Sequence, residues 1–274
     1  MKCTTKPLKP FLRWAGGKSW LTSFVFSIIE KIAINHYYEP FLGGGAVFFA
    51  LQPECAFLSD LNEELIRTYM TIREYPDEVI TKLKSFTNDS DCYYRIRKTM
   101  SNDVVYMCAR FIFLNQTSYN GLYRVNIKGH YNVPFGHRDI DFVKEDHLRE
   151  ISGVLRRADF QSGDFESCLG NIQEKDLVFL DPPYTVSHNH NGFIKYNQNL
   201  FSMGDQHRLS SFIDQIKSRG AYYILTNAAN ERIREIFDKN DIVHTLSRHN
   251  TIGGRQAKRG HVEECVFTNI RSEV

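Results

Sequence analysis

The sequence predicts a doubly wound, mostly parallel α/β fold that is interrupted by an inserted segment of helices and a β-hairpin. Two consecutive segments, residues 36–51 and 55–72, each show the order strand, turn, helix. The pattern becomes helical between residues 75 and 115, and the α/β order resumes after residue 145. A chain of 274 residues is long for one compact domain and short for two, so one large core with one insertion is the simplest expectation.

The first part of the chain supplies the opening elements of the predicted sheet. A helix is expected at residues 19–34, after the loop "RWAGGK" at 13–18. In "HYYEPFLGGGAVFFAL" a short strand ends at Glu39, and a glycine-rich turn opens a helix. In "CAFLSDLNEELIRTYMTI" a strand ends at Asp60 before the next helix. Helical connections between successive strands favour parallel pairing, because a parallel crossover needs a long connection.

Residues 65–145 are predicted to form the inserted domain, and residues 1–64 and 146–274 the core around it. Within the insertion, "DVVYMCARFIFLNQ" at 103–116 has a helical pattern. The segment "NGLYRVNIKGHYNVPFG" at 120–136 is typical of a β-hairpin. Its residues Tyr123, Val125 and Ile127 alternate with their neighbours, and "KG" at 128–129 supplies a turn.

The last part of the chain completes the sheet. The predicted elements are a short strand and loop "DFQSGDF" at 159–165, a buried strand "DLVFLD" at 176–181, a helix "QHRLSSFIDQIKS" at 206–218, and strands "AYYILTN" at 221–227 and "CVFTNI" at 265–270. Ligands of open α/β sheets bind beyond the carboxyl ends of the strands. Residues that directly follow these strands are therefore the first candidates for a functional site.

The net charge of +2 says little about partners, but the distribution of charge says more. Two stretches contain no Asp or Glu, residues 110–138 and 248–261. Their basic residues are Arg110, Arg124, Lys128 and Arg138 in the first stretch, and Arg248, Arg255, Lys258 and Arg259 in the second. Such stretches indicate a local basic surface that suits a polyanion, although an ordinary solvated face would give the same pattern.

Cysteine usage and hydropathy argue against several classes of protein. None of the six cysteines forms a C-x-x-C pair, so neither a zinc motif nor a redox motif is indicated. No apolar run reaches the roughly 18 residues that a membrane span requires. The N-terminus has no apolar signal core. We therefore expect a cytoplasmic protein with reduced thiols and no metal site.

The glycine-rich turn and Asp60 form the first chemical motif. Glycines at 43–45 let a ligand approach the backbone, and the amides at the start of the next helix attract an anion such as a carboxylate. Asp60, 21 residues after Glu39, is placed to hydrogen-bond ribose hydroxyls. The spacing is not G-x-G-x-x-G, so a dinucleotide pyrophosphate is not indicated. The loop alone fits a plain tight turn equally well, but with Asp60 it favours a nucleoside-type ligand.

The second motif is Asp181-Pro182-Pro183-Tyr184, directly after the buried strand. Pro182 has no N–H and cannot continue a strand, so the Asp181 carboxylate and the backbone carbonyls form an array of acceptors. An exocyclic –NH2 group offers two donors to such an array, and Tyr184 offers a flat face on which a ring can stack. The tetrapeptide alone is explained equally well as a turn that ends a strand.

The order of the motifs resembles that of a known family. The segments "FLRWAGGK", "EPFLGGGAVF", "LSDLN", "SGDF" and "DPPY" occur here in the order seen in the DNA adenine-N6 methyltransferases. The chain resembles in particular the Dam-like branch (D12 class, alpha group), in which a recognition domain is inserted before the DPPY strand. The resemblance covers nearly the whole chain and implies a Rossmann-like methyltransferase sheet with an inserted DNA-recognition domain.

The resemblance implies S-adenosylmethionine as the cofactor. It assigns cofactor contacts to Trp14, Lys18, Glu39, Phe41, Gly43, Gly45, Asp60, Asp164, Phe165 and Asp181. Glu39 and the glycine loop would hold the methionine end, and Asp60 the ribose hydroxyls. Asp164 would accept a hydrogen bond from the adenine amine of the cofactor, with Phe165 beside the adenine ring. The chemistry expected of this family needs no metal.

The resemblance further implies a catalytic role for Asp181, Pro182 and Tyr184, which would hold a flipped-out target adenine. It implies DNA contacts for Tyr119, Asn120, Leu122, Arg124, Asn126, Lys128, Pro134, Arg138 and Arg255, the last in the "IGGR" loop at 252–255. Hairpins of the Dam-like branch commonly read GATC, so GATC is the first expectation. The segment "SHNHNG" at 187–192 is interpreted as a polar loop rather than a metal site.

Three alternatives remain open. An RNA adenine-N6 methyltransferase would use the same pocket, although the deep, narrow groove of duplex RNA does not suit a sequence-reading hairpin. A DNA cytosine-N4 methyltransferase also acts on an exocyclic amine, but such enzymes more often carry Ser in place of Asp181. A non-catalytic DNA-binding regulator is the third. The expected partner is double-stranded DNA in a prokaryote or phage, at the nucleoid, with an independent cognate restriction endonuclease as a further partner to consider.

Overall fold

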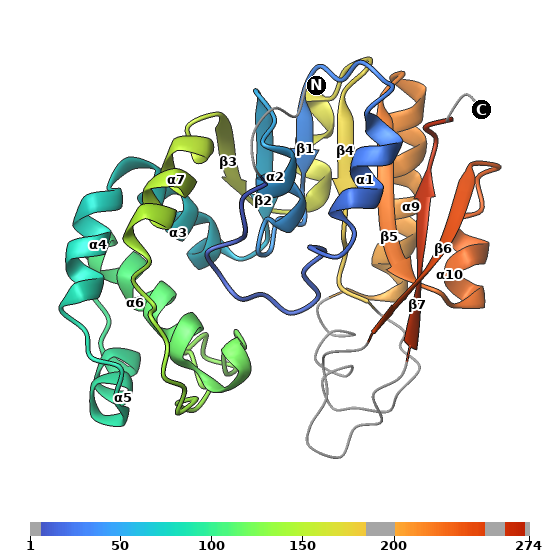
Figure 1. Ribbon diagram of the computed structural model, residues 1–274. Helices are drawn as coiled ribbons and strands as arrows, with labels where there is room; N and C mark the ends of the chain where they lie inside the picture. The colour runs from blue at the N-terminus through green and yellow to red at the C-terminus, as the bar shows by residue number, and fades with distance from the viewer. Residues whose placement is uncertain (1–6, 185–200, 250–260, 272–274) are drawn as a thin grey trace. The chain divides into compact units, whose positions relative to one another are not determined.

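A computed structural model describes residues 7–184, 201–249 and 261–271 (Figure 1). Its seven-stranded sheet has the strand order β3-β2-β1-β4-β5-β7-β6. The chain forms two compact units. Unit 1 contains Ser23–Phe41 and the chain from Asp164 onward, and unit 2 contains the segment before Ser23 together with Leu42–Gly163. The predicted α/β class with a mostly parallel sheet is confirmed.

Unit 1 contains the strands β1 (Tyr37–Glu39), β4 (Leu177–Leu180), β5 (Tyr222–Ala228), β6 (Ile242–His249) and β7 (His261–Thr268). The first three pair in parallel, whereas β7 runs antiparallel to both β5 and β6. All four residues of β4 are buried, as a central parallel strand requires. The helical elements of this unit are α1 (Thr22–Ile29), η2 (Phe165–Asn171), α9 (Met203–Ser218) and α10 (Glu231–Phe237).

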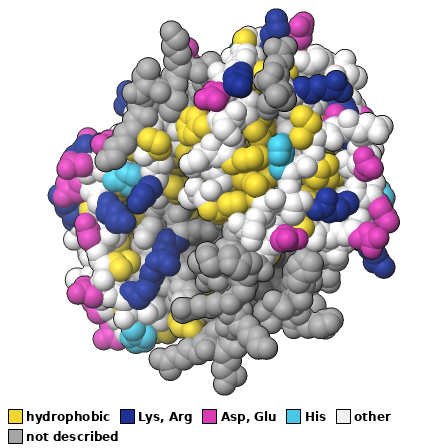
Figure 2. Space-filling view, turned by 45° about the vertical axis from the view of Figure 1, so that its right-hand side comes forward, with side chains coloured by type: hydrophobic (Ala, Val, Ile, Leu, Met, Phe, Trp, Pro, Cys, Tyr) yellow, Lys and Arg dark blue, Asp and Glu magenta, His cyan; other side chains and the backbone are white. Residues whose placement is uncertain are grey.

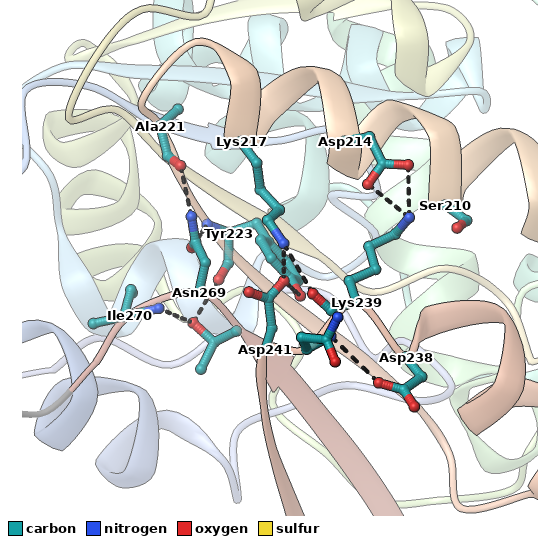
Figure 3. Close-up of polar contacts among 12 residues, drawn as sticks. Ser210, Asp214, Lys217, Ala221, Tyr223, Asp238, Lys239, Asp241, Asn269 and Ile270 are labelled. Atoms are coloured by element: carbon teal, nitrogen blue, oxygen red, sulfur yellow. Dashed lines mark hydrogen bonds and ion pairs between the residues drawn. The ribbon is translucent and has the colours of Figure 1, made fainter.

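A polar network holds the amino-terminal end of β5 in place (Figure 3). The Lys217 ammonium and the Tyr223 hydroxyl both donate to the Asp241 carboxylate. The Asn269 side chain accepts from the Tyr223 amide and donates to the Ala221 carbonyl, at 2.9 Å each. These contacts join α9, β5 and the ends of β6 and β7. The candidate site residues described below lie at the other, carboxyl end of β5.

Unit 2 contains the parallel pair β2 (Ala56–Asp60) and β3 (Ala158–Ser162). Its helical elements are α2 (Ala46–Leu51), α3 (Glu63–Glu74), α4 (Pro76–Lys84), α5 (Ser90–Lys98), α6 (Val104–Thr117), η1 (Tyr119–Gly121) and α7 (Glu145–Leu155). Side-chain caps begin three of these helices, because Asn62, Asp89 and Asp103 accept hydrogen bonds from first-turn amides. No helix among the described residues is long and apolar enough to cross a membrane.

The predicted hairpin is present, but it does not form two regular strands. Its arms meet at two isolated bridges, Ser118 with Phe135 and Val125 with Tyr131. Ile127, the last residue of the predicted alternation, is fully exposed. It lies in the turn at the tip, where the Gly129 amide donates to the Asn126 carbonyl. The arms are short because this turn consumes residues that the alternating pattern assigned to strands.

The boundaries predicted for the insertion, 65–145, stay a prediction. Unit 2 is wider than this range, because α2 and β2 before it and α7 and β3 after it pack in the same unit. The reason is visible in the packing of α3, whose buried residues lie against both α6 of the insertion and α7 beyond it. Helices of the insertion therefore share a core with elements assigned to the surrounding domain.

Candidate active site and DNA-binding residues

The DPPY segment directly follows β4, and two later strands hold its side chains. The Thr226 hydroxyl on β5 donates to Oδ1 of Asp181 at 2.8 Å. The Tyr184 hydroxyl donates to Oε2 of Glu264 on β7 at 2.7 Å. Thr226 and Glu264 are both buried, whereas Asp181 and Tyr184 are half-buried. Two buried polar groups therefore fix an acid and an aromatic ring that keep part of their surface exposed.

A second buried acid lies at the end of β1. The Tyr37 hydroxyl donates to Oε2 of Glu39 at 2.7 Å, and both residues are buried. Burial raises the pKa of Tyr37 well above its usual value, and the charges of Glu39 and Asp181 raise it further. The carboxyl ends of β1 and β4 thus bring Glu39 and Asp181 into one electrostatic environment around Tyr37, as the parallel sheet predicts.

Asp164 and Phe165 begin η2 and contact Arg208 of α9. Oδ1 of Asp164 caps η2 by accepting from the Glu166 amide at 3.0 Å, and it also accepts from Arg208 at 2.7 Å. The Arg208 guanidinium lies over the Phe165 ring, 4.9 Å from its centroid. The Phe165 ring is buried and stacks on Phe41 at 5.3 Å. Phe41, which is half-buried, therefore presents more aromatic surface than Phe165 does.

In unit 2 the glycine-rich turn packs closely against an indole ring. A Cβ atom at Gly43 would lie 2.7 Å from Cδ1 of Trp14, and one at Gly44 would lie 2.9 Å from Cβ of Trp14. Gly43 and Gly45 also have φ values of 47° and 65°, which side chains disfavour. The sequence explained these glycines by the approach of a ligand. The structure adds a second reason, which is the approach of Trp14.

Asp60 connects this turn to the end of β2. Its Oδ2 accepts from the Gly43 amide and its Oδ1 from the Asn62 amide, at 2.9 Å each. Burial raises the pKa of Asp60, although these two hydrogen bonds act in the opposite direction. The Leu61 amide also hydrogen-bonds the carboxylate, so three of its roughly four acceptor sites are used. Asp60 therefore holds the glycine-rich turn and still has acceptor capacity for a further donor.

Lys18 is buried, which argues against its being an ordinary surface charge. Its ammonium donates to the Gly16 carbonyl at 2.9 Å. A buried lysine is unusual because removing the ammonium from water is costly. The contact between Lys18 and the cofactor, which the resemblance implies, stays a prediction.

The predicted DNA-binding residues of the hairpin differ in what their side chains already do. The Arg124 guanidinium is exposed and donates from Nε to Oδ1 of Asn132 at 2.7 Å. Oδ1 of Asn126 accepts from the amides of Lys128 and His130, so it shapes the tip. Lys128 is exposed at that tip. Arg124 and Lys128 therefore remain the hairpin cations best placed to meet a partner.

Other predicted contacts lie at the base of the hairpin. Tyr119 is 53% exposed, and Asn120 has a φ of 55° that turns the chain out of α6. Leu122 is half-buried and Pro134 exposed. Arg138 has a structural role, because its guanidinium donates to the carbonyls of Gln116 and Ser118 at the end of α6. Arg255 lies outside the described residues, and a DNA contact of any of these residues stays a prediction.

The basic surface expected from the first acid-free stretch is smaller than the sequence indicated. Arg110 is buried and donates to Glu64 and to the Ile96 and Arg97 carbonyls. Arg138 is bound at the end of α6. Two of the four basic residues in this stretch therefore hydrogen-bond groups of the protein itself. Counting charges along a sequence cannot separate a cation that caps a helix from one that faces solvent.

Comparison with known proteins identifies the family. The profile of the D12 class N6 adenine-specific DNA methyltransferases matches residues 14–251. The chain belongs to this family. It is 33% identical to the "Type II methyltransferase M1.LlaDCHI" of Lactococcus lactis subsp. cremoris, over 96% of this chain and 95% of the relative. It is 35% identical to the "Type II methyltransferase M.MjaIII" of Methanocaldococcus jannaschii, over 81% and 85%. The "DNA adenine methylase" of Vibrio cholerae is 28% identical, over 95% and 96%.

This D12-class protein is therefore an adenine-specific DNA methyltransferase. Membership of the family implies S-adenosylmethionine as the methyl donor and DNA as the substrate. Relatives occur in bacteria, an archaeon and a phage. Among the residues that the structure describes, no group of His, Cys, Asp and Glu has the arrangement of a metal site.

Several residues that contact predicted site residues of this methyltransferase were not themselves predicted as site residues, among them Thr226, Glu264, Arg208 and Tyr123. Each meets its partner across a distance in sequence that no local pattern reveals. Thr226 offered a weak signal, because it and Asn227 are polar residues at the end of the apolar run 221–225.

Proposed function

We propose that this methyltransferase transfers a methyl group from S-adenosylmethionine to N6 of a flipped-out adenine in duplex DNA, within GATC as the first expectation. The observation that carries the proposal is the arrangement at the end of β4. There the half-buried Asp181 carboxylate is oriented by Thr226, and Tyr184 is fixed three residues later by Glu264.

The residues present fit S-adenosylmethionine. The Asp60 carboxylate, which has acceptor capacity beyond its backbone amide donors, would accept from a ribose hydroxyl. Glu39, a buried acid, suits the ammonium of the methionine part, and the amides after the glycine turn suit its carboxylate. Asp164 is an exposed acceptor for an adenine amine, which would share it with Arg208. When bound, the cofactor supplies an electrophilic methyl group.

Asp181 and Pro182 would act on the target amine. The N6 lone pair of adenine is delocalised into the ring, so the amine is a poor nucleophile. Hydrogen bonds from its two N–H groups to the Asp181 carboxylate and the Pro182 carbonyl would favour a more tetrahedral nitrogen with an available lone pair. The hydrogen bond from Thr226 holds one carboxylate oxygen of Asp181, which fixes the direction of the acceptor.

Tyr184 would provide the face on which the extruded base stacks. N6 of a paired adenine is hydrogen-bonded inside the duplex, so an enzyme that acts on it must take the base out of the stack. The Tyr184 hydroxyl is bound to Glu264, which restricts rotation of the ring. A ring held in this way loses little conformational entropy when a base stacks on it.

Methyl transfer by an Asp181→Ala variant tests the proposal. With labelled S-adenosylmethionine and duplex DNA, we expect the variant to lose methyl transfer while it still binds DNA. Asp159→Ala, which removes an exposed acid from β3, is the matched control and should keep full activity. Substantial turnover by Asp181→Ala would refute the assignment of this site. Transfer to ribosomal RNA in preference to DNA, or N4-methylcytosine as the product, would support the corresponding alternative.

Arg124 is proposed to read a guanine, since Arg pairs bidentately with the O6 and N7 atoms of that base. Replacing Arg124 by Ala should relax discrimination at one position of the recognition site, by about 1–3 kcal/mol. The measurement is the methylation rate on duplexes that carry each single substitution of GATC. A uniform loss of affinity across all duplexes would instead identify Arg124 as a phosphate contact.

A cognate restriction endonuclease is a proposed independent partner, supported by the names of the two type II relatives. Relatives called DNA adenine methylase support the alternative of an orphan enzyme. Challenge of the methylated DNA with endonucleases of known specificity would separate these cases. Protection against an enzyme that cuts GATC would further support the proposed site.

A further inference from the structure

Three aromatic rings of unit 2 connect the "RWAGGK" segment to the base of the hairpin. The Trp14 indole stacks on the Tyr123 ring, with centroids 5.2 Å apart and planes 23° apart. Phe111 of α6 lies beside both, 5.3 Å from Tyr123 and 6.5 Å from Trp14. Offset stacks of this kind are worth more than the area they bury. Trp14 is therefore held by a residue of the predicted recognition hairpin.

The backbone on either side of this stack is fastened as well. The Asn115 side chain accepts from the Arg13 amide and donates to the Arg13 carbonyl, at 2.8 Å each. The Gln116 side chain donates to the Phe11 carbonyl. A Cβ atom at Gly121 would lie 2.2 Å from Nε of Arg13, so only glycine fits there. Phe11, Arg13 and Trp14 thus each contact α6 or the start of the hairpin.

Trp14 in turn contacts the glycine-rich turn. The positions of Gly43 and Gly44 leave no room for a Cβ atom beside this residue. The amide of Gly43 is bound to Asp60, and its carbonyl accepts from the Tyr69 hydroxyl at 3.0 Å. A displacement of Trp14 therefore reaches the turn and the acid to which the cofactor is assigned.

Tyr123 is fixed from the other side by its hydroxyl group. It donates to Oε2 of Glu64 on α3 at 3.2 Å, and Glu64 also accepts from the buried Arg110 at 3.2 Å. The Tyr131 ring of the returning arm packs on Tyr123 at 5.8 Å, and the Tyr131 hydroxyl donates to the Leu122 carbonyl at 2.6 Å. Both arms of the hairpin therefore determine where the Tyr123 ring lies.

We infer that Tyr123 is a positioning residue for cofactor binding, through which DNA docking on the hairpin and binding of S-adenosylmethionine affect each other. The inference rests on the proposed function. DNA that restricts the hairpin also restricts Tyr123, and with it Trp14 and the glycine-rich turn. By thermodynamic linkage, a cofactor that orders this turn strengthens DNA binding by the same factor.

The first test measures the dissociation constant of S-adenosylmethionine without DNA, by calorimetry. Tyr123→Ala should weaken binding about tenfold, because the stacking partner of Trp14 is lost. Tyr123→Phe keeps the ring and removes only the bond to Glu64, so it should stay within about twofold of the wild type. Tyr94→Ala is the matched control, because Tyr94 is another half-buried tyrosine of unit 2 and packs against Arg97 and Tyr93 instead.

The second test repeats the titration with a saturating GATC duplex. We expect the wild type to bind the cofactor more tightly with DNA than without it, and Tyr123→Ala to lose most of this ratio. Tyr123→Leu, which keeps apolar volume without a flat face, should behave like Tyr123→Ala and replaces it if the alanine variant does not fold.

The outcomes separate the two proposals. If the wild type does not bind S-adenosylmethionine, the proposed function fails. If the wild type binds it and both Tyr123→Ala and Tyr123→Leu bind equally well, with an unchanged effect of DNA, the inference about Tyr123 is overturned while the proposed function stands. Equal weakening by Tyr94→Ala would also overturn it, since the effect would then come from general destabilisation.

Discussion

Asp181 and Tyr184 are oriented by side chains that lie 45 and 80 residues later in the chain. Thr226 comes from a parallel neighbour of β4, and Glu264 from the antiparallel strand beyond it, directly opposite Ala228. A short turn after a strand has few neighbours of its own, so its side chains depend on adjacent strands for their orientation. The sheet order thus determines how rigid the proposed catalytic residues are.

Glu264 is predicted to act through Tyr184. Glu264→Ala should lower the rate constant of methyl transfer by about 10- to 100-fold, the range expected for a lost hydrogen bond to a charged group. The affinity for S-adenosylmethionine should not change. Tyr184→Phe should give a similar loss, and the double variant no further loss, because both changes remove one bond. Single-turnover rates on a GATC duplex provide the measurement.

Glu264→Gln is the matched variant, since its carbonyl oxygen still accepts from the Tyr184 hydroxyl. It should recover most of the lost rate. If Glu264→Gln is as slow as Glu264→Ala, or if the losses of Glu264→Ala and Tyr184→Phe simply add, the acid has a role other than holding Tyr184.

Asp60 predicts how cofactor affinity depends on pH. Burial raises the pKa of Asp60, so it takes up a proton at a higher pH than an ordinary aspartate does. Ribose hydroxyls are proposed to donate to the carboxylate form, so affinity is fully present above the raised pKa and falls as pH decreases through it. Titration with S-adenosylhomocysteine from neutral to acidic pH should show this fall. Asp60→Asn should bind weakly at every pH, and an unchanged wild-type affinity would contradict the assignment.

At the residue scale, sequence could identify those site residues that belong to contiguous motifs. Asp60 and Asp181 were recognised because Asp60 ends a predicted strand 21 residues after Glu39 and Asp181 ends the buried segment 176–181. Glu264 was not, because its partner is 80 residues away and it stands, beside Glu263, just before the predicted strand 265–270. Contacts across a sheet depend on strand order, which the local pattern does not contain.

Among the elements, the end of α6 is stabilised by Arg138, a residue that was predicted to contact DNA. The last carbonyls of a helix lack partners within it. Arg138 supplies donors to the Gln116 and Ser118 carbonyls, and Gly136 donates its amide to the Thr117 carbonyl. The Asn88 side chain donates to the Arg138 carbonyl, which ties α5 to the same point.

Arg138→Ala should therefore destabilise the protein. The expected loss in the free energy of unfolding is about 1–3 kcal/mol, because the carbonyls of the half-buried Gln116 and the buried Ser118 lose a donor. Lys128→Ala, which removes an exposed cation from the hairpin tip, should change it by less than about 0.5 kcal/mol. Urea unfolding of both variants provides the comparison. Equal stability of the two variants would mean that the Arg138 side chain does not hold the end of α6.

Sequence patterns predicted elements best where the hydrophobic period was long or the strand fully buried. β4, β5, α3 and α9 lie within or close to their predicted segments. The helices α7 and α10 and the strand β6 were missed. α10 has only seven residues. In β6 the exposed residues Val243 and Thr245 weaken the hydrophobic pattern that indicates a strand. Short or half-exposed elements are stabilised mainly by tertiary packing, which a local pattern does not reveal.

The net charge of the whole chain predicts little general attraction to DNA. The net charge is +2, and acidic and basic side chains are mixed on the face shown in Figure 2. Arg124 and Lys128 are the exposed cations of the first acid-free stretch. A protein with few phosphate contacts loses affinity only moderately with added salt, because few counterions are released. Within the part of the chain that the structure describes, recognition should therefore depend on the hairpin and the base pocket more than on a general basic field.

The activity of the whole molecule can be read from the DNA of a host that lacks adenine methylation. Expression of this chain should introduce N6-methyladenine, and sequencing that detects this base would report the target base, its context and the activity together. We expect methylation at GATC in both strands, since the site is a palindrome. Asp181→Ala is the control and should leave the DNA unmodified at equal expression. Methylation at another motif would retain the adenine activity and replace only the recognition site, whereas N4-methylcytosine, or an unmodified genome with a folded protein, would contradict the proposed function.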